Sequence, residues 1–145
     1  VSATQLADAA ARFGMPLSPL ALVDAIGIRT AFDSGRIFWQ SFPERLDPAP
    51  ILPGMIKAGR LGRSFGGGFF GASNGSKSLA DVDDLHPAAE AVIAKYQRGH
   101  QSWSDTELTQ ILAIPMWIEA AEVLATGVVN DFESVELAMR CGLGY

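Results

Sequence analysis

The sequence predicts an all-α protein, and three observations support this. Apolar residues recur at helical spacing along most of the chain, while prolines and glycines divide it into pieces of helix length. Residues suited to cap helices stand at the start of several pieces, most clearly Ser104 and Glu107, which are spaced as in a capping box. No segment of strand length alternates clearly between apolar and polar residues. We therefore expect helices joined by loops.

The N-terminal part of the chain is expected to form several short helices. Gly14, Gly27 and Gly59 provide stops, because glycine readily adopts the left-handed conformation that ends a helix. Prolines crowd the stretch between residues 43 and 53, so this connection should be stiff and extended. The expected helices span residues 5–13, 19–26, 30–42 and 51–58.

The C-terminal part is expected to hold a glycine-rich loop after Gly59 and then three helices. His86 with Pro87 opens the first, and the long second helix runs from Ser104 to Thr126 with Pro115 as a kink. Asp131 caps the third, which should end at Cys141-Gly142. The expected domain organisation has three parts: residues 1–70, a connector with one helix at 71–103, and residues 104–145.

Composition narrows the classes of partner. The chain has 145 residues and a net charge of −5, so it lacks the broad basic face that nucleic acids and anionic membranes require. No apolar run approaches the roughly 18–20 residues of a membrane span. With Cys141 as the single cysteine, an internal disulfide is excluded. We expect neither a nucleic-acid nor a membrane partner.

A short internal repeat links the two ends of the chain. Residues 8–15, which read DAAARFGM, match residues 136–143, which read ELAMRCGL, with each copy ending in Arg-x-Gly-apolar. A chance likeness between two alanine-rich helices is the alternative. If the repeat is real, the chain begins partway into one copy and stops partway into a second.

The motifs of catalysis are missing, and one cluster of charge stands out. No Gly-x-Gly-x-x-Gly follows a strand, no histidine has metal-ligand partners at suitable spacing, and no serine lies in a nucleophile elbow, so we assign no catalytic, NAD-binding or metal-binding residue. Lys57, Arg60 and Arg63 are three cations within seven residues that run into glycines. They are candidates to bind a CoA phosphate; the alternative is a basic loop that pairs with acidic residues elsewhere.

Three stretches resemble the C-terminal domain of the 3-hydroxyacyl-CoA dehydrogenases. Residues 13–27 are similar to the stretch after its first helices, and Ala58-Gly-Arg-Leu-Gly-Arg63 followed by Gly66-x-Gly-Phe-Phe70 is similar to its closing signature. Residues 114–144 resemble the start of a second copy, as in the multifunctional β-oxidation enzymes. The resemblance implies the helical fold of the 6-phosphogluconate dehydrogenase C-terminal domain.

The resemblance also implies a function. The chain would be the substrate-lid and dimerisation portion of a cytoplasmic, NAD-dependent L-3-hydroxyacyl-CoA dehydrogenase of fatty-acid β-oxidation, and would be inactive alone. Its partners would be the acyl-CoA substrate, the NAD-binding domain of the same parent chain, and a second copy in a homodimer. The alternative is a non-catalytic helical binding or dimerisation module that has kept the fold. Gln110-Ile111 stand where the family has Asn-Arg in the second copy, so no catalytic residue is carried over.

The long helix is also expected to need a cover. Its apolar residues include Leu108, Met116 and Trp117, which is too much apolar surface for a solvated spacer. We expect it to pack against residues 5–42 and so to form a composite helical domain, in one chain or by exchange between two.

Overall fold

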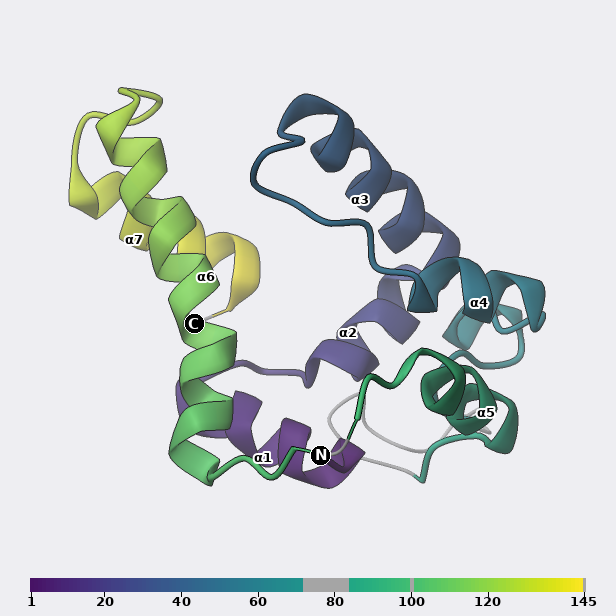
Figure 1. Cartoon of the computed structure of the whole chain (residues 1–145). Helices are drawn as coiled ribbons and strands as arrows, with labels where there is room; N and C mark the ends of the chain where they lie inside the picture. Colours follow the sequence, from purple (N-terminus) through teal and green to yellow (C-terminus); the bar gives the residue numbers. More distant parts are fainter. Residues whose placement is uncertain (72–83, 100, 145) are drawn as a thin grey trace. The chain divides into compact units, whose positions relative to one another are not determined.

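The computed structural model describes residues 1–71, 84–99 and 101–144. Within these ranges the protein is all-α, as predicted, and its extended pairing is limited to isolated bridges between Gly62 and Gly67 and between Phe70 and Leu85. The elements in chain order are α1 (Ala3–Phe13), α2 (Pro19–Ile26), α3 (Ile28–Ser41), α4 (Ile51–Lys57), a 3-10 turn η1 (Arg63–Phe65), α5 (Pro87–Tyr96), α6 (Asp105–Ala125) and α7 (Phe132–Leu143) (Figure 1).

The chain forms two compact units. Residues 1–18 and 101–145 make unit 1, and residues 19–100 make unit 2. The boundaries predicted at residues 70 and 104 separate two copies of a repeated sequence, whereas these two units are defined by packing. The predicted repeat boundaries therefore stay a prediction. Part of the predicted connector, residues 72–83 and 100, lies outside the described residues.

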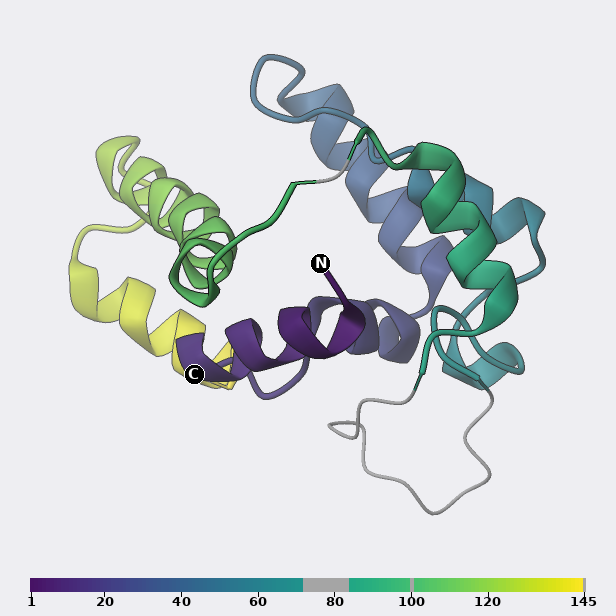
Figure 2. The same ribbon diagram turned by 60° about the horizontal axis from the view of Figure 1, so that its bottom comes forward.

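Unit 1 is built on the packing of α1 against α6 (Figures 1 and 2). The small side chains of Ala9 and Ala10 are fully buried, which lets α1 approach closely. On α6 the covered residues are Leu108 and Ala113, each 5% exposed. The long helix was expected to pack against residues 5–42; this is confirmed for α1, the part of that range that belongs to unit 1.

The start of α6 follows from its sequence. The Ser104 hydroxyl accepts a hydrogen bond from the Glu107 amide, and the Glu107 carboxylate accepts one from the Ser104 amide, so the predicted capping box is present. The helix then runs through Pro115 without a break. Contrary to the expectation from the sequence, it is long and apolar enough to cross a membrane, with a mean hydropathy of 1.4, although Glu119 and Glu122 lie within that stretch. The core helix of a soluble protein passes the same test, but such a helix is mostly buried, whereas 11% of this stretch is buried.

Asp131 caps helix α7, as predicted. Its carboxylate accepts a hydrogen bond from the Ser134 amide at 2.7 Å. The helix continues past the predicted stop at Gly142 and ends at Leu143, and its C-cap Gly144 has a left-handed φ of 77°. A Cβ built on Gly144 would lie 3.5 Å from the Pro16 ring. The end of α7 therefore lies beside the turn that follows α1, as Figure 2 shows.

Unit 2 has its own small core. Four residues from separate elements, Ile28, Met55, Phe69 and Ala89, are almost completely buried together. Helices α4 and α5 come close because residue 54 is a glycine, and a Cβ there would lie 2.8 Å from side-chain atoms of α5. Because Phe69 belongs to this core, the glycine-rich loop is anchored to the packed helices of unit 2.

Candidate functional site

The three candidate cations lie around the glycine-rich loop of unit 2. Lys57 is the last residue of α4 and is exposed, while Arg63 opens η1 and is partly buried. Arg60 follows Gly59, whose φ of 70° turns the chain out of α4. The three residues therefore share one loop, but their environments differ.

Arg60 holds the loop closed from inside. Its Nε donates to the Gly68 carbonyl at 2.9 Å, and its Nη2 donates to the Phe70 carbonyl at 2.6 Å. These contacts to a neighbouring backbone use two directions of the planar guanidinium. Two N–H groups of Arg60 therefore donate to carbonyls within the protein and are not available to a ligand.

Asp24 on α2 binds the same loop from the other side. Its Oδ1 accepts a hydrogen bond from the Phe69 amide at 2.7 Å, and its Oδ2 accepts one from the Phe70 amide at 2.9 Å. The residue is only 6% exposed. A carboxylate that accepts two backbone N–H groups satisfies donors that the loop would otherwise bury unpaired. We call Asp24, Arg60 and the backbone of residues 68–70 the loop clamp.

The electrostatics of the clamp are set mainly by burial. Loss of solvent raises the pKa of Asp24 above its ordinary value of 3.8. The amides of Phe70 and Phe69 and the positive charge of Arg60 oppose this rise. The clamp joins α2 to the loop through a carboxylate that is almost completely buried. Such a group is stable in its charged form only when its hydrogen bonds are all well formed.

The glycines of this loop are required by close packing. A Cβ on Gly68 would overlap the Asp24 carboxylate, and one on Gly67 would lie 2.7 Å from the Phe70 carbonyl oxygen. A Cβ on Gly62 would lie 2.9 Å from the Asp24 carbonyl oxygen. The glycine-rich loop is therefore a tightly packed structural element, and its backbone faces Asp24 and Arg60.

Sequence reasoning did not identify Asp24 as a functional or structural residue. The available signal was an acid within the otherwise apolar helix PLALVDAI. A buried carboxylate needs donors, and the amides of the nearby glycine-rich segment were the natural source.

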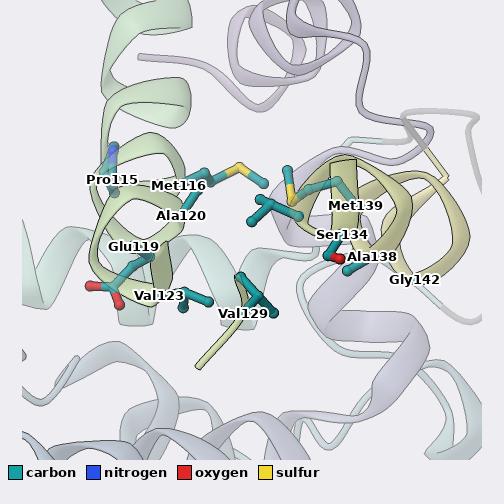
Figure 3. Close-up of a pocket in the computed structure, with 11 residues that line it drawn as sticks. Pro115, Met116, Glu119, Ala120, Val123, Val129, Ser134, Ala138, Met139 and Gly142 are labelled. Atoms are coloured by element: carbon teal, nitrogen blue, oxygen red, sulfur yellow. The ribbon is translucent and has the colours of Figure 1, made fainter. Parts of the chain in front are cut away.

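A second feature is an apolar groove in unit 1 between α6 and α7 (Figure 3). It has a volume of about 640 Å³. Met116 and Met139 point toward one another across it, and methionine adapts well to irregular apolar contacts. The lining residues are Pro115, Met116, Glu119, Ala120 and Val123 of α6, Val129 of the connection, and Ser134, Val135, Ala138, Met139 and Gly142 of α7.

A third hollow lies in unit 2 between α3 and the proline-rich connection. It has a volume of about 420 Å³ and an aromatic wall that includes Phe38 and Trp39. Pro48 and Pro50 line the opposite side. Arg36 and Asp47 are the charged residues of its lining.

Metal-ligating side chains are not grouped together in the described part of the chain. Across residues 1–71, 84–99 and 101–144, no three His, Cys, Asp or Glu side chains are grouped to hold a metal ion. The Nδ1 atom of His86 accepts from the Ala88 amide at 3.2 Å and so caps α5. Gln110 and Ile111 lie on α6 with exposed side chains.

Residues 1–72 match the family model described as 3-hydroxyacyl-CoA dehydrogenase, C-terminal domain. The matched segment includes α1 to α4, η1 and every residue of the loop clamp.

Proposed function

We propose a function from one premise: residues 1–72 belong to the 3-hydroxyacyl-CoA dehydrogenase C-terminal domain family, whose parent enzymes are NAD-dependent oxidoreductases. The chain is the helical C-terminal portion of such an L-3-hydroxyacyl-CoA dehydrogenase of fatty-acid β-oxidation. In this role it covers the acyl-CoA cleft and contributes a pairing surface. Its partners are the acyl-CoA substrate, the NAD-binding domain of the parent chain and a second copy, in the cytoplasm.

The loop clamp is the observation that best supports this proposal. It lies wholly within the family match, and it ties three distant points of the sequence, Asp24, Arg60 and residues 68–70, into one rigid corner. A surface that closes over a substrate must be held in place by such internal contacts. The clamp fixes the backbone from which the basic side chains project.

The cofactor must be held elsewhere in the parent enzyme. A dinucleotide site needs a glycine turn between a strand and a helix N-terminus, so that free amides face the pyrophosphate. Here Gly66 to Gly68 follow η1, and the next amides, of Phe69 and Phe70, are used by Asp24. This loop does not fit NAD, and no step of the reaction is assigned to the described residues.

Contact with the CoA phosphates is the finer part of the proposal. Lys57, Arg60 and Arg63 bring positive charge to one loop of a chain whose net charge is −5. Because Arg60 already binds two carbonyls, Lys57 at the exposed end of α4 is expected to contribute most to a phosphate contact. Such a contact would be weak and sensitive to salt.

We do not include nucleic acid or a membrane among the partners. The acidic net charge disfavours the first. For the second, a spanning α6 would have to place the carboxylates of Glu119 and Glu122 in the hydrocarbon, which is costly.

The assignment is tested by activity of the parent protein. It is expected to oxidise NADH in the presence of acetoacetyl-CoA, whereas residues 1–145 alone are expected to give the rate of the buffer blank. Removal of the 3-hydroxyl proton needs a positioned base and hydride transfer needs a held nicotinamide, and the described residues supply neither. A parent protein that folds, binds NADH and yet leaves acetoacetyl-CoA unchanged would count against the dehydrogenase role.

One observation favours a second candidate, a non-catalytic module that kept the fold. Gln110 and Ile111 of α6 occupy the place of the family's Asn-Arg pair in the second copy. If this is the true role, the chain would bind acyl-CoA or pair with itself while the parent protein shows no turnover.

A further inference from the structure

Helix α3 carries a glycine in its middle that the fold itself does not require. Gly35 has an ordinary helical backbone, so no left-handed conformation demands a glycine at this position. A Cβ built on Gly35 would meet nothing within 4 Å, so close packing does not demand one either. Glycine inside a helix is less favourable than alanine. This position therefore weakens α3 and leaves open space beside the helix.

The space beside Gly35 is framed by aromatic rings. Three aromatic residues lie three or four positions from it along α3: Phe32, Phe38 and Trp39. Residues at this spacing are neighbours on the surface of a helix. All three line the hollow of about 420 Å³ in unit 2, together with Gly35 itself. The missing side chain thus opens a notch between aromatic rings, which we call the α3 notch.

Prolines form the opposite wall of this hollow. The connection that follows α3 returns alongside that helix toward α4 (Figure 1), and Pro48, Pro50 and Pro53 line the hollow from this side. Each pyrrolidine ring fixes its backbone φ, so the wall is stiff. The volume of the hollow lies within the roughly 300–1,000 Å³ of small-molecule sites. Two walls of rings with a gap between them suit a planar ligand.

Two charged residues add polar groups to a lining that is otherwise apolar. Arg36 follows Gly35 on α3, and Asp47 precedes Pro48 in the connection. Arg36 also lies 4.0 Å from Asp33, in an exposed ion pair that contributes little. A guanidinium only donates hydrogen bonds, and a carboxylate only accepts them. A ligand that satisfies both must carry an acceptor and a donor on its edge.

We propose that the hollow beside α3 binds an adenine ring. Adenine is planar, its ring nitrogens accept hydrogen bonds and its exocyclic amine donates them. The ring stacks on the aromatic face of α3, as bases do on aromatic side chains in general. A ring nitrogen accepts from Arg36, and the amine donates to Asp47. The site shares no residue with the loop clamp, so its failure leaves the dehydrogenase role standing.

An NMR titration of the isotope-labelled wild-type chain with adenosine tests the proposal. The chain has three tryptophans, so the indole N–H signal of Trp39 is identified from its loss in Trp39→Phe. We expect this signal to shift and to saturate at millimolar concentrations or below. The signals of Trp103 and Trp117, which belong to unit 1, should stay in place. The wild-type titration needs no variant that might fail to fold.

Gly35→Leu fills the α3 notch. It is expected to raise the dissociation constant for adenosine at least about tenfold, because the new side chain occupies the place of the ring. Leucine is a better helix former than glycine, so the unfolding midpoint of the variant should not fall. The matched control is Ser34→Leu, which adds the same side chain at an exposed position of α3 outside the lining of the hollow. It should leave the dissociation constant unchanged.

Asp47→Ala separates the polar contact from stacking. It should weaken the binding of adenosine and leave that of purine riboside, which lacks the exocyclic amine, unchanged. An adenine ring reaches the hollow either in a free nucleoside or as the base of CoA. CoA that shifts the Trp39 signal as adenosine does supports the proposal with CoA as a source, whereas CoA without effect supports it for the free nucleoside alone. Pantetheine, the part of CoA without adenine, should leave the signal in place.

The proposal is overturned by adenosine that leaves the Trp39 signal in place at every concentration. Equal affinity of Gly35→Leu and Ser34→Leu for adenosine also overturns it, and so does a Trp39 shift caused by pantetheine. An equal effect of Asp47→Ala on adenosine and purine riboside overturns the contact with the amine and with it the choice of adenine. None of these results bears on the dehydrogenase role, which the acetoacetyl-CoA assay tests separately.

Discussion

The rings of Phe13 and Trp117 meet with their centroids 6.4 Å apart and their planes tilted by 58°. Nearby, Arg12 lies 3.5 Å from the Asp105 carboxylate. The ring contact is of the tilted kind that aromatic pairs prefer, while the ion pair is exposed and contributes little. Together they show that the helix at the start of the chain is the cover for the first half of α6.

Gly68→Ala is expected to destabilise unit 2. The new Cβ would overlap the Asp24 carboxylate, so either the loop or α2 must shift. Overpacking of this kind costs about 1–3 kcal/mol of unfolding free energy, which thermal or urea unfolding followed by circular dichroism can measure. Gly71→Ala is the matched control, since a Cβ there meets nothing within 4 Å. Equal stability of the two variants would show that the clamp is not tightly packed.

Asp24→Asn is expected to lower the free energy of unfolding by about 2 kcal/mol. The amide keeps one acceptor, but its NH2 group would face the N–H of Phe69 or Phe70, leaving a buried donor unpaired. Urea unfolding of the variant and the wild type measures this difference in the free energy of unfolding. Asp33→Asn, at an exposed acid 4.0 Å from Arg36, should change stability by less than about 0.5 kcal/mol.

The pH dependence of the Asp24→Asn effect has a definite sign. Burial raises the pKa of Asp24 above 3.8, so the folded protein binds this proton more tightly than the unfolded chain does. The contribution of the group to stability therefore increases as pH falls through the raised pKa toward 3.8, and decreases as pH rises through that window. The stability difference between the wild type and Asp24→Asn should be larger near pH 4 than at pH 7. A smaller difference at pH 4 would mean that hydrogen bonding outweighs burial.

Ser104→Ala is expected to weaken the start of α6. Loss of the N-cap hydroxyl costs about 1 kcal/mol, measurable as reduced stability of unit 1 with fraying of the first turn by amide exchange. Ser102→Ala, in the exposed segment before the cap, is the control. Hydrogen bonds from Ser104 lower the pKa of Glu107 below 4.5, so the stabilisation from Glu107 is present above that pH and is lost as pH falls through the lowered pKa.

Lys57→Ala is expected to weaken binding of free CoA and to reduce its dependence on salt. Lys57 is exposed at the end of α4, and its removal leaves the loop clamp untouched. Isothermal titration at two salt concentrations measures both effects. Lys95→Ala on α5 is the control of equal charge change. If the two variants bind CoA alike, the basic loop has no special role in phosphate contact.

The parts of this fold that were predictable from the sequence are those set by neighbours along the chain. The caps at Ser104 and Asp131 and the stop at Gly14 depend on residues three or four positions apart, and all three are present. Gly142 shows the limit of this reasoning. A single glycine costs a helix only about 1 kcal/mol, so α7 continues through it to Leu143.

The loop clamp could not be predicted from the sequence because its partners are distant along the chain. Asp24 and Phe69 are brought together only when α2 packs beneath the loop, and nothing in the spacing of either segment signals the other. The same holds for Arg60, which was predicted to be a candidate for phosphate contact from its charge alone. Its bonds to the carbonyls of residues 68 and 70 are a tertiary property.

The division of unit 1 between residues 1–18 and 101–145 has a kinetic consequence. In unit 2 the helix pairs α2–α3, α3–α4 and α4–α5 are consecutive along the chain, so most of its helix packing can form early, at a small cost in loop entropy. α1 can find α6 only by closing a loop that contains the whole of unit 2. Folding of unit 2 makes that loop compact and shortens the search. The two ends of the chain should therefore be the last part of the molecule to become ordered and the first to open.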